Sequence, residues 1–433
     1  MCIRDRFKIK DEAFQYVQSI DSDLAFNYQG KNIAVKKEKL RETFLKQSHL
    51  IFNPHYLEHL PIHNKKILRD DKNNSFFPFL NKIMKVDKNG MSAIGYQELL
   101  DICVWKNHII QRDFQMSEDY SSCHFNRFLL NIANNDLHRY RSLISALGYL
   151  QHNYQSPKNA QAVICYDENL TDSDNPQGGT GKGLFVQAPK QMRNTVIIDG
   201  KKMNLEDRFI WQDVTVQSQI VVIHDPKPSL NFSAFHSCLS DGWSIEKKNQ
   251  PQFSIKPEES PKMVITSNSI VKGEGTTNKR RQYIIEFSDH YQKQIIKGIE
   301  EPIVAEHGCL FFDKDDWSKE EWNKFDNLML MAVSDYLKNG LYSYDLINVA
   351  QNKLVQSTNE DFYTWTSEQC FEVDKQYCAD DLFSEFKSTY YGDDKDFKQR
   401  KFTNWIKEFA KMRNWKYNRT PSNGKSNFTF KSI

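Results

Sequence analysis

The residues whose types and spacing best fit a defined chemistry lie in the segment Asn175 to Gly183, which reads NPQGGTGKG. The segment follows an apolar run, Ala162 to Tyr166, and precedes another, Leu184 to Val186. In such a loop, backbone N–H groups turn toward phosphate oxygens, the following helix N-terminus adds positive potential, and a lysine reaches the β- and γ-phosphates. We therefore predict an ATP site made by Gly178, Gly179, Thr180, Gly181, Lys182 and Gly183.

This loop departs from the pattern GxxxxGK[ST] at two positions. Pro176 stands at the place of the first glycine, and Gly183 stands where a hydroxyl side chain would bind Mg²⁺. Pro189 should end or kink the following helix within about two turns, because proline has no N–H to donate. The departures weaken the prediction of a metal site, and a flexible surface turn is the alternative interpretation of the segment.

Two later apolar runs end in polar residues that could act on the same nucleotide. Gln219 to Ile223 is followed by His224 and Asp225, and an acid in this place can hold Mg²⁺ and polarise water. Two adjacent acids are the usual arrangement, so the histidine is a departure, and an aspartate that only caps a loop is the alternative. Met263 to Thr266 leads to Asn268, whose amide could hold the attacking water, although such an asparagine can also be a plain turn residue. We predict Asp225 as the metal ligand and Lys182, Asp225 and Asn268 as catalytic residues.

A basic run, Lys279 to Arg281, precedes the apolar run Tyr283 to Phe287. The guanidinium of Arg280 or Arg281 could stabilise the charge that develops on the nucleotide of a neighbouring subunit. A solvated basic face is the alternative for such a run. The order of loop, acid, asparagine and arginines along the chain favours the catalytic interpretation.

Hydrophobic periodicity indicates the elements that must position these residues. The pattern from residue 10 to 155 is mainly helical, interrupted by a strand pair over Ile83 to Ile94 that turns at Lys88 to Gly90. One helix face is formed by Tyr140, Leu143, Ile144, Leu147 and Leu150. The apolar runs named above, together with Thr195 to Ile198, alternate with loops and helices and so predict an α/β sheet. Residues 300 to 360 return to helical spacing.

Composition bounds the class of protein. A chain of 433 residues exceeds the size of one hydrophobic core, and 39% hydrophobic with 26% charged residues is typical of a globular protein. No apolar run approaches the length of a membrane helix, so a cytoplasmic protein is expected. The eight cysteines form no CxxC pair, which argues against a zinc site or a disulfide framework. The net charge of +2 requires any nucleic-acid surface to be local.

Order, spacing and residue type together resemble the superfamily 3 helicases, AAA+ motors of viral and phage replication, and most closely their poxvirus-type primase-helicase branch. The resemblance spans residues 80 to 300. It rests on ICYDE at Ile164 to Glu168, GGTGKGLF at Gly178 to Phe185, VVIHD at Val221 to Asp225, EKKN at Glu246 to Asn249, VITSN at Val264 to Asn268, and KGEG with RR at Lys272 to Gly275 and Arg280 to Arg281.

The resemblance implies a hairpin between the acidic strand and the asparagine strand that grips single-stranded DNA in the channel of a ring. Lys247 and Lys248 match it. Two cations beside Trp243 would neutralise phosphates and offer a stacking surface. A plain solvated hairpin is the alternative.

The end of the chain carries a dense basic segment, Lys398 to Arg419, that contains a single acid, Glu408. An apolar helix face over Phe402 to Phe409 followed by aromatic runs and a turn at Asn423 suggests a winged helix. Side chains on such a domain could contact duplex phosphates, with a solvated basic face as the alternative. The predicted DNA contacts are Lys407, Lys411 and Arg413.

These inferences predict an α/β fold: an AAA+ P-loop ATPase core with a helical N-terminal region and a C-terminal winged helix. The expected domains are a mostly helical region at 1–110, the ATPase core at 111–300, a helical lid at 301–370 and the winged helix at 371–433. The expected activity is ATP- and Mg²⁺-dependent unwinding of forked DNA by a ring, a hexamer, translocating on single-stranded DNA.

Two other classes stay open at this stage. A replication initiator that binds nucleotide but hydrolyses it poorly is favoured by Gly183 and His224, and a small-molecule kinase is disfavoured by the long insertion before Asn268. The opening MCIRDR resembles translated adaptor sequence, so a primase or polymerase domain is expected either upstream on the same chain or as a partner.

Overall fold

The computed structural model describes residues 3–53, 66–156, 158–168, 179–228, 230–269, 271–272, 275–344, 349–392, 394, 396–422 and 425–432. The chain divides into two units, Met1–Lys66 and Ile67–Ile433. The predicted boundary at 110 therefore falls inside the second unit, because residues 67–110 pack into its core. Gly178, Pro176 and Asn423 lie outside the described residues.

The first unit is a helix, hairpin and helix. Its elements are α1 (Ile3–Ser19), β1 (Leu24–Tyr28), β2 (Lys31–Val35) and α2 (Lys37–Ile51). The two helices meet at Phe14 and Phe44, whose ring centroids are 6.1 Å apart, and Arg41 Nη2 donates to the carbonyl oxygens of Gln18 and Ile20. Most of the other apolar side chains that the structure describes in this unit are exposed.

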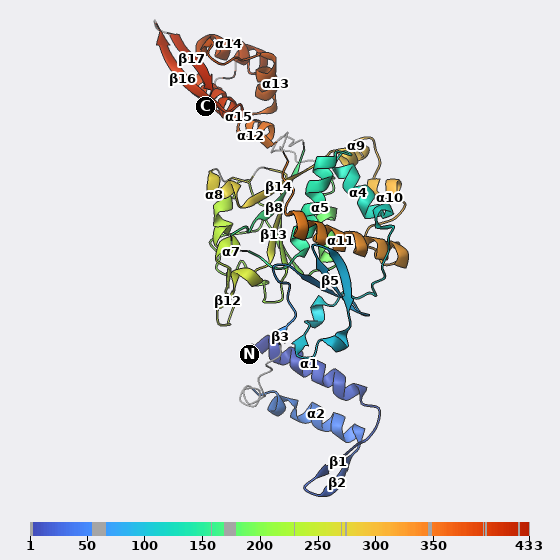
Figure 1. Cartoon of the computed structure of the whole chain (residues 1–433). Coiled ribbons are helices and arrows are strands. Elements are labelled where there is room, and N and C mark those ends of the chain that lie inside the picture. The colour runs from blue at the N-terminus through green and yellow to red at the C-terminus, as the bar shows by residue number, and fades with distance from the viewer. Residues whose placement is uncertain are drawn as a thin grey trace. The chain divides into compact units, whose positions relative to one another are not determined.

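A five-stranded parallel sheet forms the centre of the second unit (Figure 1). The strands are β8 (Ala162–Asp167), β9 (Thr195–Asp199), β10 (Ile220–His224), β13 (Lys262–Thr266) and β14 (Gln282–Phe287), in the spatial order β14-β8-β13-β10-β9. All five apolar runs predicted as strands are confirmed. The inner strands β8, β10 and β13 are buried on both faces, which explains why they read as nearly continuous apolar runs, whereas the edge strand β9 is half-buried and exposes Ile197.

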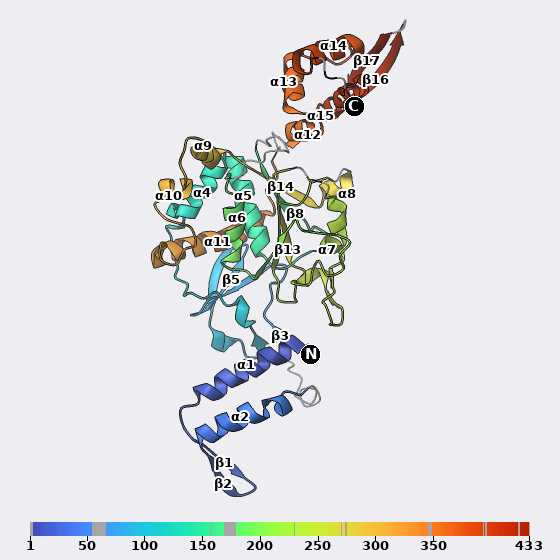
Figure 2. The same ribbon diagram turned by 180° about the vertical axis from the view of Figure 1, so that it is seen from behind.

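Alternate residues of the strands face two separate cores. Val163 and Cys165 of β8 lie in a core with α4 (His124–Ile132), α5 (Leu137–Gln151), α6 (Lys182–Lys190) and α11 (Lys319–Asn339). Ile164 and Tyr166 face the other core, with η4 (Phe232–Phe235), α7 (His236–Ser240) and the hairpin of β11 (Trp243–Ile245) and β12 (Phe253–Ile255). Figures 1 and 2 show α5 and α7 on opposite sides of the sheet. The predicted amphipathic helix is α5, with Leu143, Leu147 and Leu150 fully buried.

The strand order reverses at β8. The chain leaves β8 for β9 at one edge of the sheet, whereas from β13 it passes β8 to reach β14 at the other edge. Ligands of open parallel sheets bind outside the carboxyl ends of the strands at such a switch point. The expected binding place is therefore the carboxyl end of β8 and β13.

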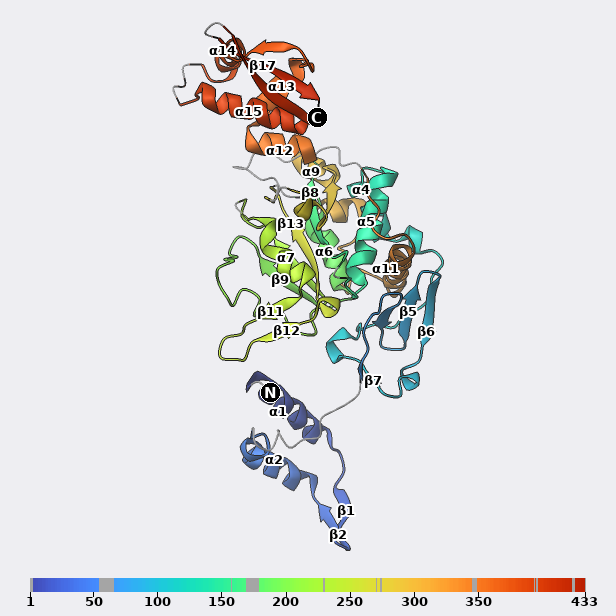
Figure 3. The ribbon, with the colours of Figure 1, turned by 60° about the vertical axis from the view of Figure 1, so that its left-hand side comes forward.

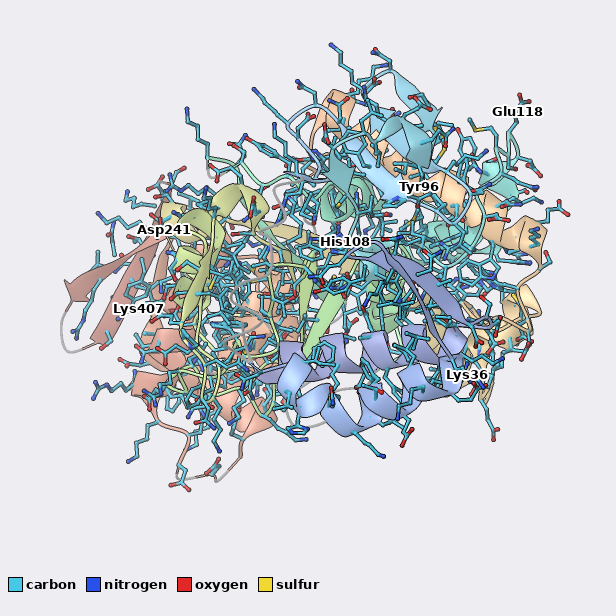
Figure 4. The ribbon with its side chains drawn as sticks, turned by 90° about the horizontal axis from the view of Figure 1, so that it is seen from below. Lys36, Tyr96, His108, Glu118, Asp241 and Lys407 are labelled. Atoms are coloured by element: carbon cyan, nitrogen blue, oxygen red, sulfur yellow. The ribbon has the colours of Figure 1, made fainter. Side chains whose placement is uncertain are left out.

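Residues 66–110 are strands and short 3-10 helices, so the prediction of a mostly helical region is wrong here. The elements are β3 (Lys66–Ile67), β4 (Ser75–Pro78), β5 (Ile83–Asp87), β6 (Gly90–Ile94), η1 (Tyr96–Glu98), β7 (Ile102–Cys103) and η2 (Lys106–His108). The predicted strand pair is β5 and β6, joined at Asp87 and Gly90; Figure 3 shows it beside α11. His108, labelled in Figure 4, bonds through Nε2 to the carbonyl oxygen of Gln217 at 2.8 Å.

The helices after the sheet belong to the same core rather than to a separate lid. They are α9 (His290–Ile296), α10 (Pro302–His307) and α11. Three shorter helices lie earlier in the chain: η3 (Tyr120–Ser122) before β8, η5 (Pro257–Glu259) before β13 and α8 (Thr276–Lys279) before β14. Phe325 and Met329 of α11 are fully buried in the core that also holds α5. The predicted lid at 301–370 is thus divided between this core and the C-terminal region.

The C-terminal region, Val349–Ser432, has its own aromatic core. It contains α12 (Val349–Ser357), α13 (Glu360–Glu368), β15 (Gln376–Cys378), α14 (Ala379–Tyr390), α15 (Gln399–Met412), β16 (Trp415–Ser422) and β17 (Lys425–Ser432), with an antiparallel sheet ordered β15-β17-β16. Phe362 and Trp365 of α13 pack with Phe402 of α15, so the predicted boundary at 371 cuts through this core. The predicted helix and hairpin at the end of the chain are α15 with β16 and β17. None of the helices in the described ranges has the length and apolar character to cross a bilayer.

Candidate nucleotide site

The loop before α6 requires glycine at two described positions. Gly179 has φ +100°, and a Cβ there would lie 2.4 Å from Ile295 Cδ1 of α9. Gly181 has φ +99° and precedes the first residue of α6, and a Cβ there would lie 2.9 Å from the Phe128 ring of α4. Since both positions have left-handed backbone and no room for a side chain, the glycine-rich sequence follows from the turn itself. Pro189 lies in the last turn of α6, which ends at Lys190 as expected.

Lys182 is buried and its ammonium contacts three oxygen atoms. Nζ pairs with Asp167 Oδ2 at the carboxyl end of β8, donates to Asn268 Oδ1 at 2.8 Å, and lies 3.5 Å from Thr180 Oγ1. Thr180 donates in turn to Asp167 Oδ1 at 2.5 Å. The phosphate-loop lysine and the asparagine that the sequence predicts as a water-positioning residue are therefore in direct contact.

The tip of β13 is tied to β8, which fixes the place of Asn268. The backbone N–H of Ser267 donates to the carbonyl oxygen of Cys165 at 3.1 Å, and the Tyr166 hydroxyl accepts from the backbone N–H of Val271 at 2.8 Å. Burial raises the pKa of Tyr166, so the phenol stays protonated. Asn268 is thus held at the switch point of the sheet by contacts on both sides of it.

Asp225 lies at the end of β10, next to the tip of β13. Its φ of 44° turns the chain sharply out of the strand, a conformation that aspartate tolerates better than most residues. Its backbone N–H donates to the carbonyl oxygen of Thr266 at 2.9 Å, and its side chain is half-buried. The three predicted site residues therefore lie at the carboxyl ends of neighbouring strands of the sheet: Lys182 beside β8, Asn268 after β13 and Asp225 after β10.

His224 occupies the place of a second acid but behaves differently. Its Nδ1 lies 2.8 Å from Thr266 Oγ1. Burial lowers the pKa of His224, an effect only partly opposed by the carboxylates of Asp225 and Asp199. The imidazole is therefore neutral at pH 7 and adds no negative charge for a cation or a water molecule.

The side-chain oxygen atoms at the carboxyl ends of these strands are suited to bind a magnesium ion whose other ligands come from a nucleotide. Among the described residues, no three His, Cys, Asp or Glu side chains are grouped as a metal site of their own. Mg²⁺ commonly takes only one or two carboxylates and fills the rest of its shell with phosphate oxygens and water. Asp225, Asp167 and the Thr180 hydroxyl are the side chains that could contribute here.

Gly183 supplies no hydroxyl, yet the site has room for one. A Cβ at Gly183 would meet no atom within 4 Å, and α6 already contains the residue. We expect Gly183→Ser to fold with equal or slightly higher stability, since glycine inside a helix costs about 0.5–1 kcal/mol. We also expect it to tighten the binding of Mg–ATP, measured by titration calorimetry. Gly183→Ala is the matched control, because it adds the Cβ without the hydroxyl and should leave that affinity unchanged.

Arg280 and Arg281 lie away from this cluster in their own chain. They directly precede β14, whose Gln282 pairs with Ala162 at the start of β8, whereas Asp167 pairs with Phe287. A strand of six residues, about 20 Å at some 3.3 Å per residue, therefore separates the arginines from Lys182. Arg281 bonds to Ser240 Oγ through Nε and Nη2, while Arg280 is exposed.

The predicted lysine hairpin is present as β11 and β12, with Lys247 and Lys248 in its turn (Figure 3). Lys248 is exposed, and Lys247 lies over the ring of Phe253 at 5.6 Å. Trp243, however, is 2% exposed and packs on Trp211 with ring centroids 4.8 Å apart. The expected stacking role of Trp243 is therefore wrong, because this residue belongs to the core.

The basic residues of the C-terminal region lie on its surface. Lys407, labelled in Figure 4, is exposed and lies 5.6 Å from the ring of Tyr417. Lys411 pairs with Glu408 at 2.8 Å, and Arg413 is exposed beside Phe409 and Trp415. Lys401, at the start of α15, lies over the rings of Phe397 and Trp405.

Two acidic residues and an arginine near the loop were not predicted as site residues. Asp167 is the last residue of β8 and Glu168 follows it. Arg139 of α5 bonds to Glu168 Oε2 at 2.5 Å and lies 3.8 Å from Glu286 Oε2. Arg139 is 6% exposed. The sequence signals were the position of the two acids, directly after an apolar run, and their place in the motif ICYDE, which gave neither residue a role.

Comparison with known proteins adds little to this geometry. No protein-family model matches the chain, and no curated protein matches it. Among solved structures it is similar to the apo C-terminal region of NrS-1, with 15% identity and a TM-score of 0.34 over 84% of this chain and 97% of that one. It is also similar to JCV helicase in complex with an acetamide compound, with 13% identity and a TM-score of 0.26 over 56% of this chain and 69% of that one. Scores this low assign neither fold nor function.

Proposed function

We propose that this chain is an ATP-dependent DNA motor of the superfamily 3 type, with an AAA+ core, acting as the helicase module of a phage or mobile-element primase-helicase. The observation that carries the proposal is the contact of Lys182 with Asn268 at the switch point of the sheet, with Asp225 on the next strand. A surface turn would not bring a phosphate-loop lysine to this point. The sequence motifs and the parallel sheet support the same assignment.

In the proposed cycle, the glycine loop and the N-terminus of α6 bind the phosphates of ATP, and Lys182 neutralises the β- and γ-phosphates. Asn268 orients the attacking water. Asp225 would be among the residues that hold Mg²⁺, and the metal would supply positive charge beside the phosphates when it is bound. Because Arg280 is exposed and distant from Lys182 of its own chain, it would complete the site of the next subunit in a hexameric ring, with Arg281 as the second candidate.

The proposal assigns DNA contacts to two surfaces. Lys247 and Lys248 in the β11–β12 turn would hold the phosphates of single-stranded DNA and move with the state of the nucleotide. Lys407, Lys411 and Arg413 would contact duplex phosphates at the fork. The order α13, β15, α14, α15, β16 and β17 in the C-terminal region supports a winged helix, in which the helix before the hairpin faces DNA.

The direct experiment is ATP turnover with and without single-stranded DNA. We expect DNA to stimulate turnover in the native chain, and Lys247→Ala/Lys248→Ala to abolish most of that stimulation. The slope of log affinity against log salt should fall by about 0.7 for each phosphate contact removed. Lys201→Ala/Lys202→Ala, another exposed lysine pair, is the matched control and should retain both properties.

A second candidate is a DNA-binding replication initiator that uses nucleotide for assembly. It is favoured by Gly183 and by the neutral His224, since both remove groups that aid hydrolysis. This candidate predicts ATP binding and DNA binding with no turnover that DNA can stimulate. A phosphorylated small molecule formed in the absence of DNA would instead indicate a kinase and would overturn both candidates.

A further inference from the structure

The carboxylate of Asp167 lies in the space next to Lys182 where a nucleotide's phosphates are expected. It is 5% exposed, ends β8, and contacts both the Lys182 ammonium and the Thr180 hydroxyl. Lys182 itself is 7% exposed. The pair is therefore a buried ion pair inside the phosphate-binding loop, between the first strand and the first helix turn.

Binding of a triphosphate has to change this pair. Lys182 can neutralise the phosphates only if its ammonium turns away from Asp167, at least in part. The carboxylate would then be buried without its cation and beside several negative charges, which is strongly unfavourable. A second cation at the same place removes that difficulty, and Mg²⁺ accompanies ATP.

The residues around Lys182 also indicate a role for Asp167 as a metal ligand, because two neighbouring positions lack the side chains that would otherwise bind Mg²⁺. Gly183 offers no hydroxyl to a magnesium ion, and His224 offers no carboxylate. Asp167 Oδ1 and Oδ2 and Thr180 Oγ1 are hard oxygen atoms of the kind that Mg²⁺ prefers. They lie beside the loop lysine, which is the end of the site nearest the phosphates.

We propose that Asp167 exchanges Lys182 for the magnesium ion of an incoming Mg–ATP, either as a direct ligand or through a bound water. In the empty site the carboxylate holds Lys182 in place. In the filled site it faces the cation, and Lys182 faces the phosphates. Nucleotide binding consequently depends on the metal, and Asp167 is the residue responsible for that dependence. This inference rests on the proposed ATP site.

The test compares the affinity for ATP in the presence of Mg²⁺ and of a chelator, by titration calorimetry of the full chain. We expect the native chain to bind Mg–ATP at least about tenfold more tightly than metal-free ATP, because the like charges repel without the cation. Asp167→Asn should bind metal-free ATP more tightly than the native chain does and should gain less than about twofold from Mg²⁺. The amide keeps the size of the carboxylate and can still accept from Thr180.

Two further variants complete the design. Asp199→Asn removes an exposed carboxylate at the end of the edge strand β9 and should keep the native dependence on Mg²⁺. Asp167→Asn/Gly183→Ser should regain part of it, because the new hydroxyl offers another oxygen to the metal. Thermal unfolding of each variant identifies any loss of folding. Comparison of the double variant with Asp167→Asn then shows whether a new oxygen ligand restores the dependence of ATP affinity on Mg²⁺.

The outcomes separate this inference from the proposed function. Native chain that binds no ATP under either condition refutes the nucleotide site and the inference together. Native chain that binds ATP equally well with and without Mg²⁺ leaves the site intact and overturns the inference alone. Equal dependence on Mg²⁺ in Asp167→Asn and native chain also overturns it.

Discussion

Lys182→Ala is expected to reduce ATP turnover to background and, at the same time, to lower the free energy of unfolding by about 3–5 kcal/mol, the usual cost of leaving one buried ion-pair partner alone. The first effect follows from the loss of the only loop cation that can reach the β- and γ-phosphates. The second follows from Asp167, whose side chain is 7% exposed and would retain Thr180 as its hydrogen-bond donor but no cation. Turnover assays and urea denaturation measure the two effects separately.

A double-mutant cycle distinguishes catalysis from folding in this result. Lys182→Ala/Asp167→Asn removes both charges, so its stability should recover by about 1–3 kcal/mol relative to the sum of the single variants. Turnover should stay at background in the double variant. A turnover rate that Lys182→Ala leaves unchanged would eliminate the motor, whatever the stability data show.

The strands and the loop of this site could be predicted because parallel strands leave a clear pattern. Runs such as Val163 to Tyr166 are apolar at every position, since both faces of the sheet are covered. Polar residues that follow such runs gather at the carboxyl ends of the strands, which places Asn268 at the switch point and Asp225 at the end of the neighbouring strand β10. The glycine spacing predicted Lys182 as a site residue without knowledge of any contact.

The role of Asp167 could not be predicted in the same way. Asp167 and Lys182 are 15 residues apart in the chain, and nothing in the local sequence states which strand-end carboxylate turns toward the lysine. The stacking role assigned to Trp243 failed for a related reason. Side chains alternate along a strand, so Trp243 and Ile245 point into the core while Ser244 points outward, and closeness to Lys247 in the sequence does not place the ring near a ligand.

The contacts group the chain differently from the predicted domains, because amphipathic segments do not reveal which core they enter. Helix α13 begins after Asn359, whose side chain accepts from the backbone N–H of Phe362, and its Phe362 and Trp365 resemble any helix face. Only the contacts show that this face belongs with Phe402 and Phe430. In residues 67–110 the strands are too short to show a clear alternation of apolar and polar residues. A buried ion pair, which could not be predicted from the sequence, connects this segment to the residues just before β9.

That ion pair joins Arg193, at the start of the segment leading into β9, to Asp70. Arg193 Nη2 donates to Asp70 Oδ2 at 2.9 Å and to Ser75 Oγ at 2.8 Å, and Nε donates to the carbonyl oxygen of Gln151 at 2.7 Å. The guanidinium also lies 3.9 Å from the centroid of the Phe77 ring. Burial lowers the pKa of Arg193, and Asp70 opposes that effect.

Asp70→Ala should therefore be among the most destabilising single substitutions in the chain, with a loss of about 3–5 kcal/mol in the free energy of unfolding. The side chains of Arg193 and Asp70 are 3% and 2% exposed in the native pair, so the arginine would be left as a buried charge without its partner. The backbone N–H of Asn153 would also lose its acceptor. Urea denaturation gives the magnitude, and because the pair is buried the loss should change little with salt. Asp113→Ala, at an exposed carboxylate of the same region, should stay within about 0.5 kcal/mol of native. A loss below about 1 kcal/mol for Asp70→Ala would be typical of a solvent-exposed pair and would mean that residues 67–110 are not held to the core around the parallel sheet by this contact.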